Sequence, residues 1–316
     1  MTLEEVFAAL VDEGRVNLSG DSAFAKDLRL HGIEIVGDEA RLPKDIRLLK
    51  HRKILESLGP EASEWLSSLR LFPHVESTNQ CLMNMAEHAP IDGRVLLAEV
   101  QTGGRGRRGR TWVSPFGRNI AMSIGMSLAY PSSGLGAISL VVGVAIAEVL
   151  QSVGVRNVEL KWPNDVLIEG RKVSGILIEL TNRSDPVEIV IGIGINVGAR
   201  GLLTKEIEYE VADLTDQIRD LSRSILAGEI INSVHLNCRE FEKLGFRVFR
   251  DRWMALHAYQ NRRVAAVSGS GTIHGICRGI SLSGAMLIDD GEELIELIGG
   301  EITVRKGRGG DDDLIC

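Results

Sequence analysis

The stretch from Gln101 to Arg118 combines positive charge with backbone freedom. It reads QTGGRGRRGRTWVSPFGR and holds five arginines, five glycines and no acid, although the whole chain has a formal net charge of −7. Arginine keeps its proton in proteins and offers a planar fork of donors that matches carboxylates and phosphates. Glycine lets backbone N–H groups approach an anion closely. We therefore expect a flexible loop that closes over a small polyanionic molecule.

Arg/Gly runs also occur in disordered tails that bind nucleic acid. Here the run lies between two apolar, strand-like segments, 95–100 and 120–128, and it contains a Trp-Val-Ser-Pro-Phe insert. This position inside the chain favours the ligand loop over the tail.

Three further motifs carry weaker signals. Lys161 ends a strand-like segment and precedes a Pro-Asn-Asp turn, which indicates either a cation at a sheet edge or a surface turn with an incidental lysine. Gly192 and Gly194 occupy alternate positions of a strand, so that one face can lie flat against a ligand or against a helix. The run Glu76-Ser-Thr-Asn79 places small hydrogen-bonding groups before an amphipathic helix, where a simple helix cap is the alternative.

The bulk composition is that of a soluble globular protein. The 316 residues are 44% hydrophobic and 25% charged, and they predict two or three domains. The longest apolar run, 135–150, carries Glu148 and is shorter than the roughly 20 residues of a membrane helix, and the acidic start lacks the basic region of a signal peptide. Four distant cysteines without a CxxC pair indicate free thiols in the cytoplasm, and with no HExxH motif we expect no structural metal site.

Helix and strand signals begin with a compact N-terminal stretch, residues 1–55. Helices are predicted over 3–12 and 21–31, the second capped by Ser19 or Asp21 and stopped by Gly32. A short β-ribbon over 33–36 and 40–42 follows. The order resembles the end of a winged helix-turn-helix.

The remaining chain predicts a large middle stretch, 60–260, and a small final one, 261–306. The middle has strand signals over 95–101, 120–128, 158–162, 173–180 and 187–197, and helix signals over 79–88, 135–153 and 221–257, the last broken near Gly245. Alternating patterns favour a largely antiparallel sheet with helices on one face. The final stretch predicts a small β-barrel from strands over 264–267, 272–281, 285–288 and 294–304, before a disordered tail, 307–316.

In their order and spacing these motifs resemble the bacterial biotin protein ligases over nearly the whole chain. The pieces that carry the resemblance are ESTN at 76–79, GRGRRGR at 104–110 with the following WVSPFG, KWPNDVL at 161–167, GILIEL at 175–180, GIGIN at 192–196 and GGEITVR at 299–305. The resemblance implies an α+β fold. Its parts are a winged-helix-like domain, a central class II synthetase-like mixed sheet with helices, and a C-terminal SH3-like barrel.

The resemblance also implies two half-reactions. Biotin and MgATP give biotinyl-5′-adenylate and pyrophosphate, and the adenylate then acylates one lysine of the biotin carboxyl carrier protein. Biotin's carboxylate is already ionised, so the first step needs two anions held together rather than a general base. Arg107 and Lys161 are the expected catalytic cations, with Arg105 beside them. Asp165 is either a helper for the acceptor lysine or a turn residue.

The family's binding residues are carried over to matching positions. Ser77, Thr78 and Gln101 would bind biotin's ureido ring, and Gly104, Arg105, Gly106 and Arg107 would form the loop over its valerate and the phosphate. Gly192 and Gly194 would form the floor, and Asn79 and Lys161 would also bind biotin. Arg105, Arg107, Arg108, Arg110, Trp112 and Asn196 would bind the nucleotide. Trp112 would pack near the adenine, or else hold the base of the loop.

The N-terminal stretch departs from the family pattern. Two helices precede the ribbon where the DNA-binding motif has three, and residues 1–45 hold ten acids against five bases, a balance that opposes phosphate binding. Lys26, Arg29 and His31 could still line one helix face. Binding of operator DNA as a biotin-operon repressor and a purely structural remnant therefore remain alternatives.

Two other functions of the whole chain are possible interpretations. One is a lipoate-type ligase, for which the ureido-binding groups would have no purpose. The other is a DNA-binding biotin sensor that catalyses no reaction. A homodimer is expected when the adenylate is bound, with strand 187–195 as an edge that could pair. No membrane partner is expected.

Overall fold

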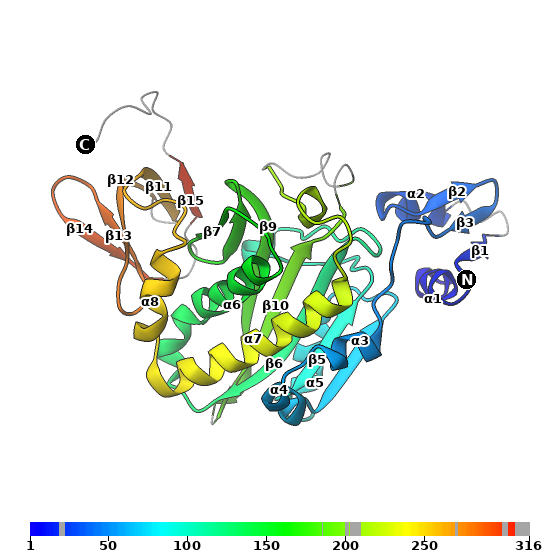
Figure 1. The fold of residues 1–316 in the computed structure, drawn as a ribbon, viewed down its shortest axis with the longest axis horizontal. Coiled ribbons are helices and arrows are strands. Elements are labelled where there is room, and N and C mark those ends of the chain that lie inside the picture. The colour runs from blue at the N-terminus through cyan, green and yellow to red at the C-terminus, as the bar shows by residue number, and fades with distance from the viewer. Residues whose placement is uncertain are drawn as a thin grey trace.

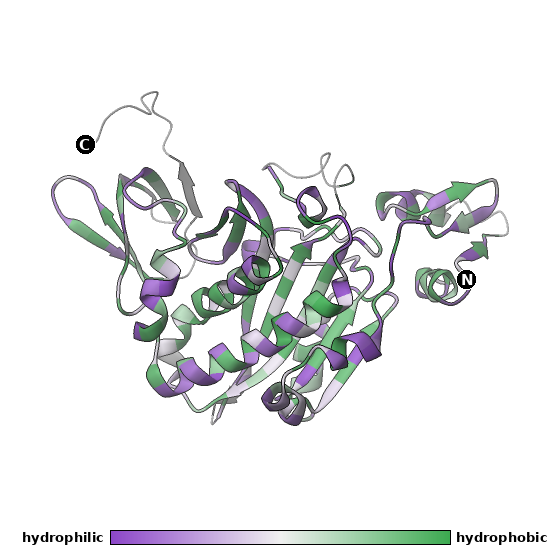
Figure 2. Cartoon of the chain, in the orientation of Figure 1, coloured by the Kyte–Doolittle hydropathy of each residue, from purple (hydrophilic) through white to green (hydrophobic). Residues whose placement is uncertain are grey.

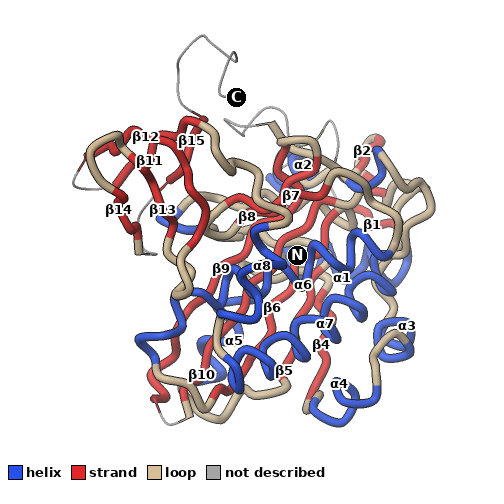
Figure 3. The backbone as a smooth tube through the Cα atoms, turned by 60° about the vertical axis from the view of Figure 1, so that its left-hand side comes forward, coloured by secondary structure: helices blue, strands red, loops and turns tan. Residues whose placement is uncertain are grey.

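The computed structural model describes residues 1–18, 23–184, 186–199, 202, 210–268, 271–298 and 303–306. Within these residues the strands form three sheets that follow one another along the chain. In Figure 1 the largest occupies the centre and the other two lie on either side of it, and Figure 3 shows the same helices and strands after a turn of the molecule.

The N-terminal unit, residues 1–46, has two described helices around a small antiparallel sheet of order β1-β3-β2. Its elements are α1 (Leu3–Glu13), β1 (Arg15–Asn17), α2 (Ala23–Leu30), β2 (Glu34–Val36) and β3 (Glu39–Arg41). Thr2 and Glu5 form a capping box on α1, and Gly14 ends it in the left-handed region at φ 73°. Both helices and the ribbon are as predicted. The short β1 was missed, and the expected caps Ser19 and Asp21 lie outside the described residues.

The central sheet has seven strands in the order β4-β5-β6-β10-β9-β8-β7, and only the β4–β5 pair is parallel. The strands are β4 (Ser68–Phe72), β5 (Arg94–Ala98), β6 (Asn119–Leu128), β7 (Val158–Lys161), β8 (Asp165–Ile168), β9 (Arg171–Ser184) and β10 (Val187–Asn196). The mainly antiparallel prediction is confirmed. The short β4 and β8 were missed, and β9 extends beyond its expected ends.

The prediction that strand 187–195 is a free edge is wrong. β10 lies inside the sheet and pairs with β6 on one side and β9 on the other. Its backbone groups are therefore used within the chain, and a dimer cannot form by adding a strand to it.

Helices cover both faces of the central sheet, so the prediction of a single helical face is also wrong. The helices of this part are α3 (His51–Glu56), α4 (Pro60–Trp65), α5 (Thr78–Ala86), α6 (Ile138–Ser152), α7 (Arg223–Leu244) and α8 (Arg247–Met254). Leu96 of β5 packs with Leu82 of α5, while its neighbour Val95 belongs to the core under α6 and α7. Successive strand residues point to opposite faces, so β5 buries both, and the central strands are mainly green or pale in Figure 2.

α6 is the apolar centre of the fold. Together with the preceding turn, Gly134–Ser152 is the one described helix long and apolar enough to cross a membrane, but 72% of its apolar window is buried inside the structure. A core helix accounts for that composition. The predicted break between α7 and α8 is confirmed at Gly245, which has φ 69°.

The C-terminal strands form one antiparallel sheet of order β14-β13-β12-β11-β15. They are β11 (Arg263–Ser268), β12 (Gly271–Ile280), β13 (Met286–Asp289), β14 (Leu294–Leu297) and β15 (Thr303–Lys306). The single strand predicted over 294–304 is thus two strands on opposite edges. Residues 299–302, which begin the GGEITVR motif, and the tail 307–316 lie outside the described residues.

A buried ion pair ties the helical layer to the segment that enters the core. Glu99 follows β5 and Arg223 begins α7; Arg223 Nη2 lies 2.6 Å from Glu99 Oε2, and both side chains are at least 93% buried. Glu99 also accepts from the Leu49 backbone at 2.5 Å, and Arg223 donates to the Arg47 carbonyl at 2.8 Å. The pair therefore fixes residues 47–49 against the central sheet.

Replacing Glu99 by Gln should lower the free energy of unfolding by about 3–5 kcal/mol, because it leaves the buried Arg223 charge without its carboxylate. Urea denaturation followed by tryptophan fluorescence measures this. The control is Glu56→Gln, whose partner Arg52 is 90% exposed, and it should cost less than about 1 kcal/mol. Equal effects of the two variants would contradict the assignment.

His257 makes the stability depend on pH where α8 meets the C-terminal sheet. Burial lowers its pKa to about 4, against the opposing hydrogen bond to Gln260, and its Nε2 lies 3.7 Å from Cys277 Sγ. Between pH 6.5 and about 4 the unfolded chain binds this proton more readily than the folded chain. The neutral ring therefore stabilises the fold above pH 6.5, and that stability is lost as the pH falls towards 4.

In His257→Gln, the loss of unfolding free energy between pH 6.5 and 4 should be smaller than in the wild type by on the order of 2 kcal/mol. Denaturation curves at half-unit pH intervals give both profiles. If the unfolding free energies of the variant and the wild type fell in parallel as the pH is lowered, groups other than His257 would cause the acid sensitivity.

Candidate functional site

A pocket of about 800 Å³ lies over strands β9 and β10. Ile191, Ile193 and Ile195 of β10 belong to the core beneath the helices. The alternating Gly192 and Gly194 therefore point to the opposite face, where they line the pocket.

Most of the predicted site residues meet in this pocket. Those that line it are Ser77, Thr78, Asn79, Gln101, Arg105, Gly106, Arg107, Arg110, Trp112, Lys161, Gly192 and Gly194, together with Asp165. They come from the start of α5, the loop after β5, the β7–β8 turn and β10, segments that are far apart in the sequence.

Three predicted residues lie outside the lining. Gly104 accepts a hydrogen bond from the Trp112 backbone at 2.9 Å and so shapes the loop from behind. Arg108 adopts a left-handed φ of 60° within the turn at 107–109. Asn196 is buried, and its Nδ2 donates to the Ala212 carbonyl at 3.2 Å, so it supports the sheet end rather than the pocket.

One end of the pocket is a buried polar cluster. Gln101 Oε1 accepts from the Thr78 backbone at 2.8 Å. Ser77 caps α5, accepting from the Gln80 backbone at 3.4 Å, so the helix-cap reading holds alongside a place in the lining. Ser123, which the sequence analysis missed, lies 2.6 Å from Thr78 Oγ1 and 2.5 Å from Asn79 Oδ1. Its signal was a polar residue in the middle of a mostly apolar strand, β6.

The glycines of the pocket floor serve both purposes that the sequence suggested, close packing and a flat surface for a ligand. A Cβ atom at Gly192 would collide with the Asn79 amide, and one at Gly194 with the Trp112 ring. The glycines therefore let α5 and the loop approach the strand, and they also leave a flat surface in the pocket. Trp112 lies at the base of the loop over this surface.

The other end of the pocket is cationic. Burial lowers the pKa of Arg107, repulsion from Arg108 and Arg110 adds to this, and attraction by Asp165 opposes it; arginine nevertheless stays protonated. Lys161 lines the same wall.

Lys172, Tyr259 and Glu210 also line this region and were missed by the sequence analysis. Lys172 Nζ lies 2.6 Å from Asp165 Oδ1 and 5.5 Å from the centroid of the Trp112 ring. No local motif marks these residues, because strand pairing and the turn before β11 bring them to the site. Among the described residues no group of three or more His, Cys, Asp or Glu gathers as a metal site would require.

The N-terminal unit packs on the last residues of the loop, between Ser114 and Arg118. The Phe7 and Phe116 rings stack with centroids 5.3 Å apart, and Arg118 donates to both oxygens of Asp45, at 2.5 and 3.0 Å. His31 Nδ1 lies 3.2 Å from the Ser114 carbonyl, so His31 faces this contact rather than an open DNA-binding face with Lys26 and Arg29, which are exposed.

Comparisons with known proteins agree with this geometry. Residues 71–196 match the Biotin/lipoate A/B protein ligase family. The chain is 36% identical to the Bifunctional ligase/repressor BirA of Escherichia coli (strain K12), covering 88% of this chain and 86% of that protein. It is 30% identical to the Biotin--[acetyl-CoA-carboxylase] ligase of Mycobacterium tuberculosis, covering 84% and 97%.

A solved structure gives the same fold. The biotin protein ligase from Aquifex aeolicus in complex with biotin and ATP superposes with a TM-score of 0.67 and 29% identity, covering 77% of this chain and all of that one. The mixed α/β architecture with its large mixed sheet is therefore that of a biotin protein ligase. This chain belongs to the Biotin/lipoate A/B protein ligase family, among its biotin protein ligases.

Proposed function

We propose that this protein is a biotin protein ligase that makes biotinyl-5′-adenylate from biotin and MgATP and transfers biotin to a lysine of the biotin carboxyl carrier protein, in the cytoplasm. The observation that carries this is one pocket with a buried polar cluster at one end and Arg107, Lys161 and Lys172 at the other. Its volume of about 800 Å³ lies within the range of small-molecule sites.

The polar end suits the ureido ring of biotin. Thr78 and Gln101 are buried hydrogen-bonding residues at the pocket wall, and a site of this kind rejects ligands that leave its polar groups unpaired. A lipoate-type ligase has no use for them. The name of the Mycobacterium tuberculosis relative, Biotin--[acetyl-CoA-carboxylase] ligase, and the biotin complex of the Aquifex aeolicus ligase support the same choice.

The cationic end suits the first half-reaction. The biotin carboxylate attacks the α-phosphorus of ATP, an oxygen–phosphorus bond forms, and pyrophosphate leaves. Arg107 and Lys161 would hold the two anions together and stabilise the charge on the phosphoryl oxygens, with Arg105 and Arg110 on the loop. Trp112, held over the glycine floor, would present its ring to the adenine.

Magnesium would enter with ATP and neutralise part of the triphosphate charge. Mg²⁺ is usually held by one or two carboxylates together with substrate phosphates. Glu210 supplies a carboxylate in the pocket wall, whereas Asp165 is paired with Lys172. This donor set suits a metal brought by the nucleotide rather than a resident metal centre.

In the second half-reaction the amine of the carrier lysine attacks the acyl carbon of the adenylate. The bond to the phosphate oxygen breaks, AMP leaves and the amine loses a proton. A loop closed over the adenylate would protect this mixed anhydride from water. Asp165 is paired with Lys172 at 2.6 Å, which favours a structural role for this carboxylate over that of a proton acceptor.

Arg107→Ala should reduce ATP-dependent transfer of labelled biotin to a purified carrier-protein fragment by about 100-fold or more, by analogy with removing one charge-stabilising donor. Lipoic acid in place of biotin should give no labelling. Arg108→Ala is the matched control, because Arg108 lies on the same turn outside the pocket lining. Absence of transfer by the wild type, with biotin still bound, would instead support a sensor.

The domain division 1–55, 60–260, 261–306 and a tail 307–316, with a winged-helix-like start and an SH3-like end, is part of this proposal. So is a homodimer formed when the adenylate is bound, by a surface other than β10. The relative's name BirA, a ligase/repressor, supports a role in repression, while the balance of ten acids to five bases in residues 1–45 opposes it.

A gel-shift assay distinguishes an N-terminal unit that binds operator DNA as a repressor from one that is only a structural remnant. With the biotin-operon DNA of the source organism, biotin and ATP at about 50 mM salt, a repressor should shift the DNA, and the shift should weaken steeply as salt rises. Lys26→Ala with Arg29→Ala should abolish it. No shift at low salt would leave the N-terminal unit with its structural role alone.

A further inference from the structure

Glu179 of β9 stands between the polar cluster and the arginine loop. Its Oε2 accepts from Asn79 Nδ2 at 2.7 Å, and its Oε1 lies 3.8 Å from Arg105 Nη2. Glu179 lies within the GILIEL motif but was not among the expected site residues, and it is not part of the pocket lining. Both oxygens of its carboxylate are nevertheless directed at residues expected to bind the ligand.

Both polar atoms of the Asn79 amide are engaged in this arrangement, and one N–H of Nδ2 is left over for a further partner. Its Oδ1 lies 2.5 Å from Ser123 Oγ and can only accept, so it takes the hydroxyl hydrogen of Ser123, while its Nδ2 donates to Glu179. Asn79 is therefore held in one orientation. A hydrogen-bonded chain runs from Ser123 through Asn79 to the Glu179 carboxylate.

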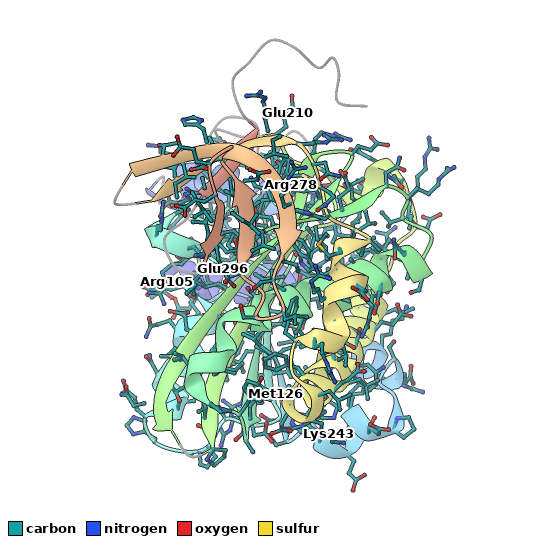
Figure 4. The ribbon with its side chains drawn as sticks, turned by 90° about the vertical axis from the view of Figure 1, so that its left-hand side faces the viewer. Arg105, Met126, Glu210, Lys243, Arg278 and Glu296 are labelled. Atoms are coloured by element: carbon teal, nitrogen blue, oxygen red, sulfur yellow. The ribbon has the colours of Figure 1, made fainter. Side chains whose placement is uncertain are left out.

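Arg105 is held at the rim of the pocket by the other end of this chain. Its Nη2 donates to Gln80 Oε1 at 2.8 Å and faces Glu179 Oε1. The Arg105 side chain is 43% exposed, and Figure 4 shows the residue at the edge of the molecule. The guanidinium thus rests on two groups of the protein itself.

We propose that Glu179 is a positioning residue that holds Arg105 in an open position, in competition with the anionic group of the ligand. The proposal rests on the function proposed above, in which Arg105 approaches the carboxylate or phosphate. An anion in the pocket attracts the same guanidinium, and Arg105 must leave Glu179 to reach it. The apparent affinity for an anionic ligand is then the intrinsic affinity multiplied by the fraction of protein in which Arg105 is free of Glu179.

The competition is weak enough to be reversed by a ligand. Glu179 is 27% and Arg105 43% exposed, and partly exposed ion pairs of this length contribute modestly. A weak hold suits a loop that must open for each turnover. A fully buried pair, such as Glu99–Arg223, could not be exchanged in this way.

The test is Glu179→Gln in the full-length protein, with binding of biotin and of its uncharged amide measured by titration calorimetry. Gln keeps an oxygen for Asn79 and removes the charge facing Arg105. Biotin should bind about two- to five-fold more tightly, and the amide should bind as it does to the wild type. In an Arg105→Ala background, the gain for biotin should vanish.

Glu76→Gln is the matched control, because Glu76 is an exposed acid that lies against Gly103 of the same loop. It should leave both affinities unchanged. An equal gain in Glu76→Gln, an equal gain for the amide, or weaker binding of both ligands by Glu179→Gln would each overturn the proposal. Failure of the wild type to bind biotin would instead refute the proposed function.

Discussion

The pocket depends on a stretch of sheet without side chains. Gly175 of β9 pairs with Gly194 of β10, and Gly192 lies two residues away on the same face. The Trp112 ring occupies the space above Gly194, and the Asn79 amide that above Gly192. Any larger residue would push the loop or α5 off the strand. The polar and cationic ends of the pocket can therefore share one floor only because these positions have no Cβ atom.

The loop over this floor is fixed at both ends. Gln101 is bonded to Thr78 at its start, and Arg118 pairs with Asp45 of the N-terminal unit at its end. One of the five arginines thus serves structure rather than a ligand. Phe7 also stacks on Phe116 in the same segment, so the N-terminal unit supports the base of the loop. At least one of its acids, Asp45, therefore has a structural partner in Arg118.

Local sequence patterns predicted most helices and strands, whereas they could not predict which strands lie next to each other in the sheet. The helices at 3–12 and 79–88 and the break at Gly245 follow from caps, periodicity and glycine, which act within a few residues. The interior place of β10 depends on which strands flank it, and no local signal contains that. Lys172 and Glu179 were missed for the same reason: each reaches the site through the pairing of β9. Asn196, placed at the phosphates by analogy, supports the sheet end instead.

The electrostatics of the site explain why a net-acidic protein carries so basic a loop. Arg107 is partly desolvated beside two other arginines, an unfavourable arrangement in the absence of an anion. Asp165, the carboxylate that attracts Arg107, is already engaged by Lys172. In the proposed reaction, two anions that repel each other in water would gain a common counter-charge from this loop. The anions would in turn offset the repulsion among the arginines, as the arginines would offset the repulsion between the two reactants.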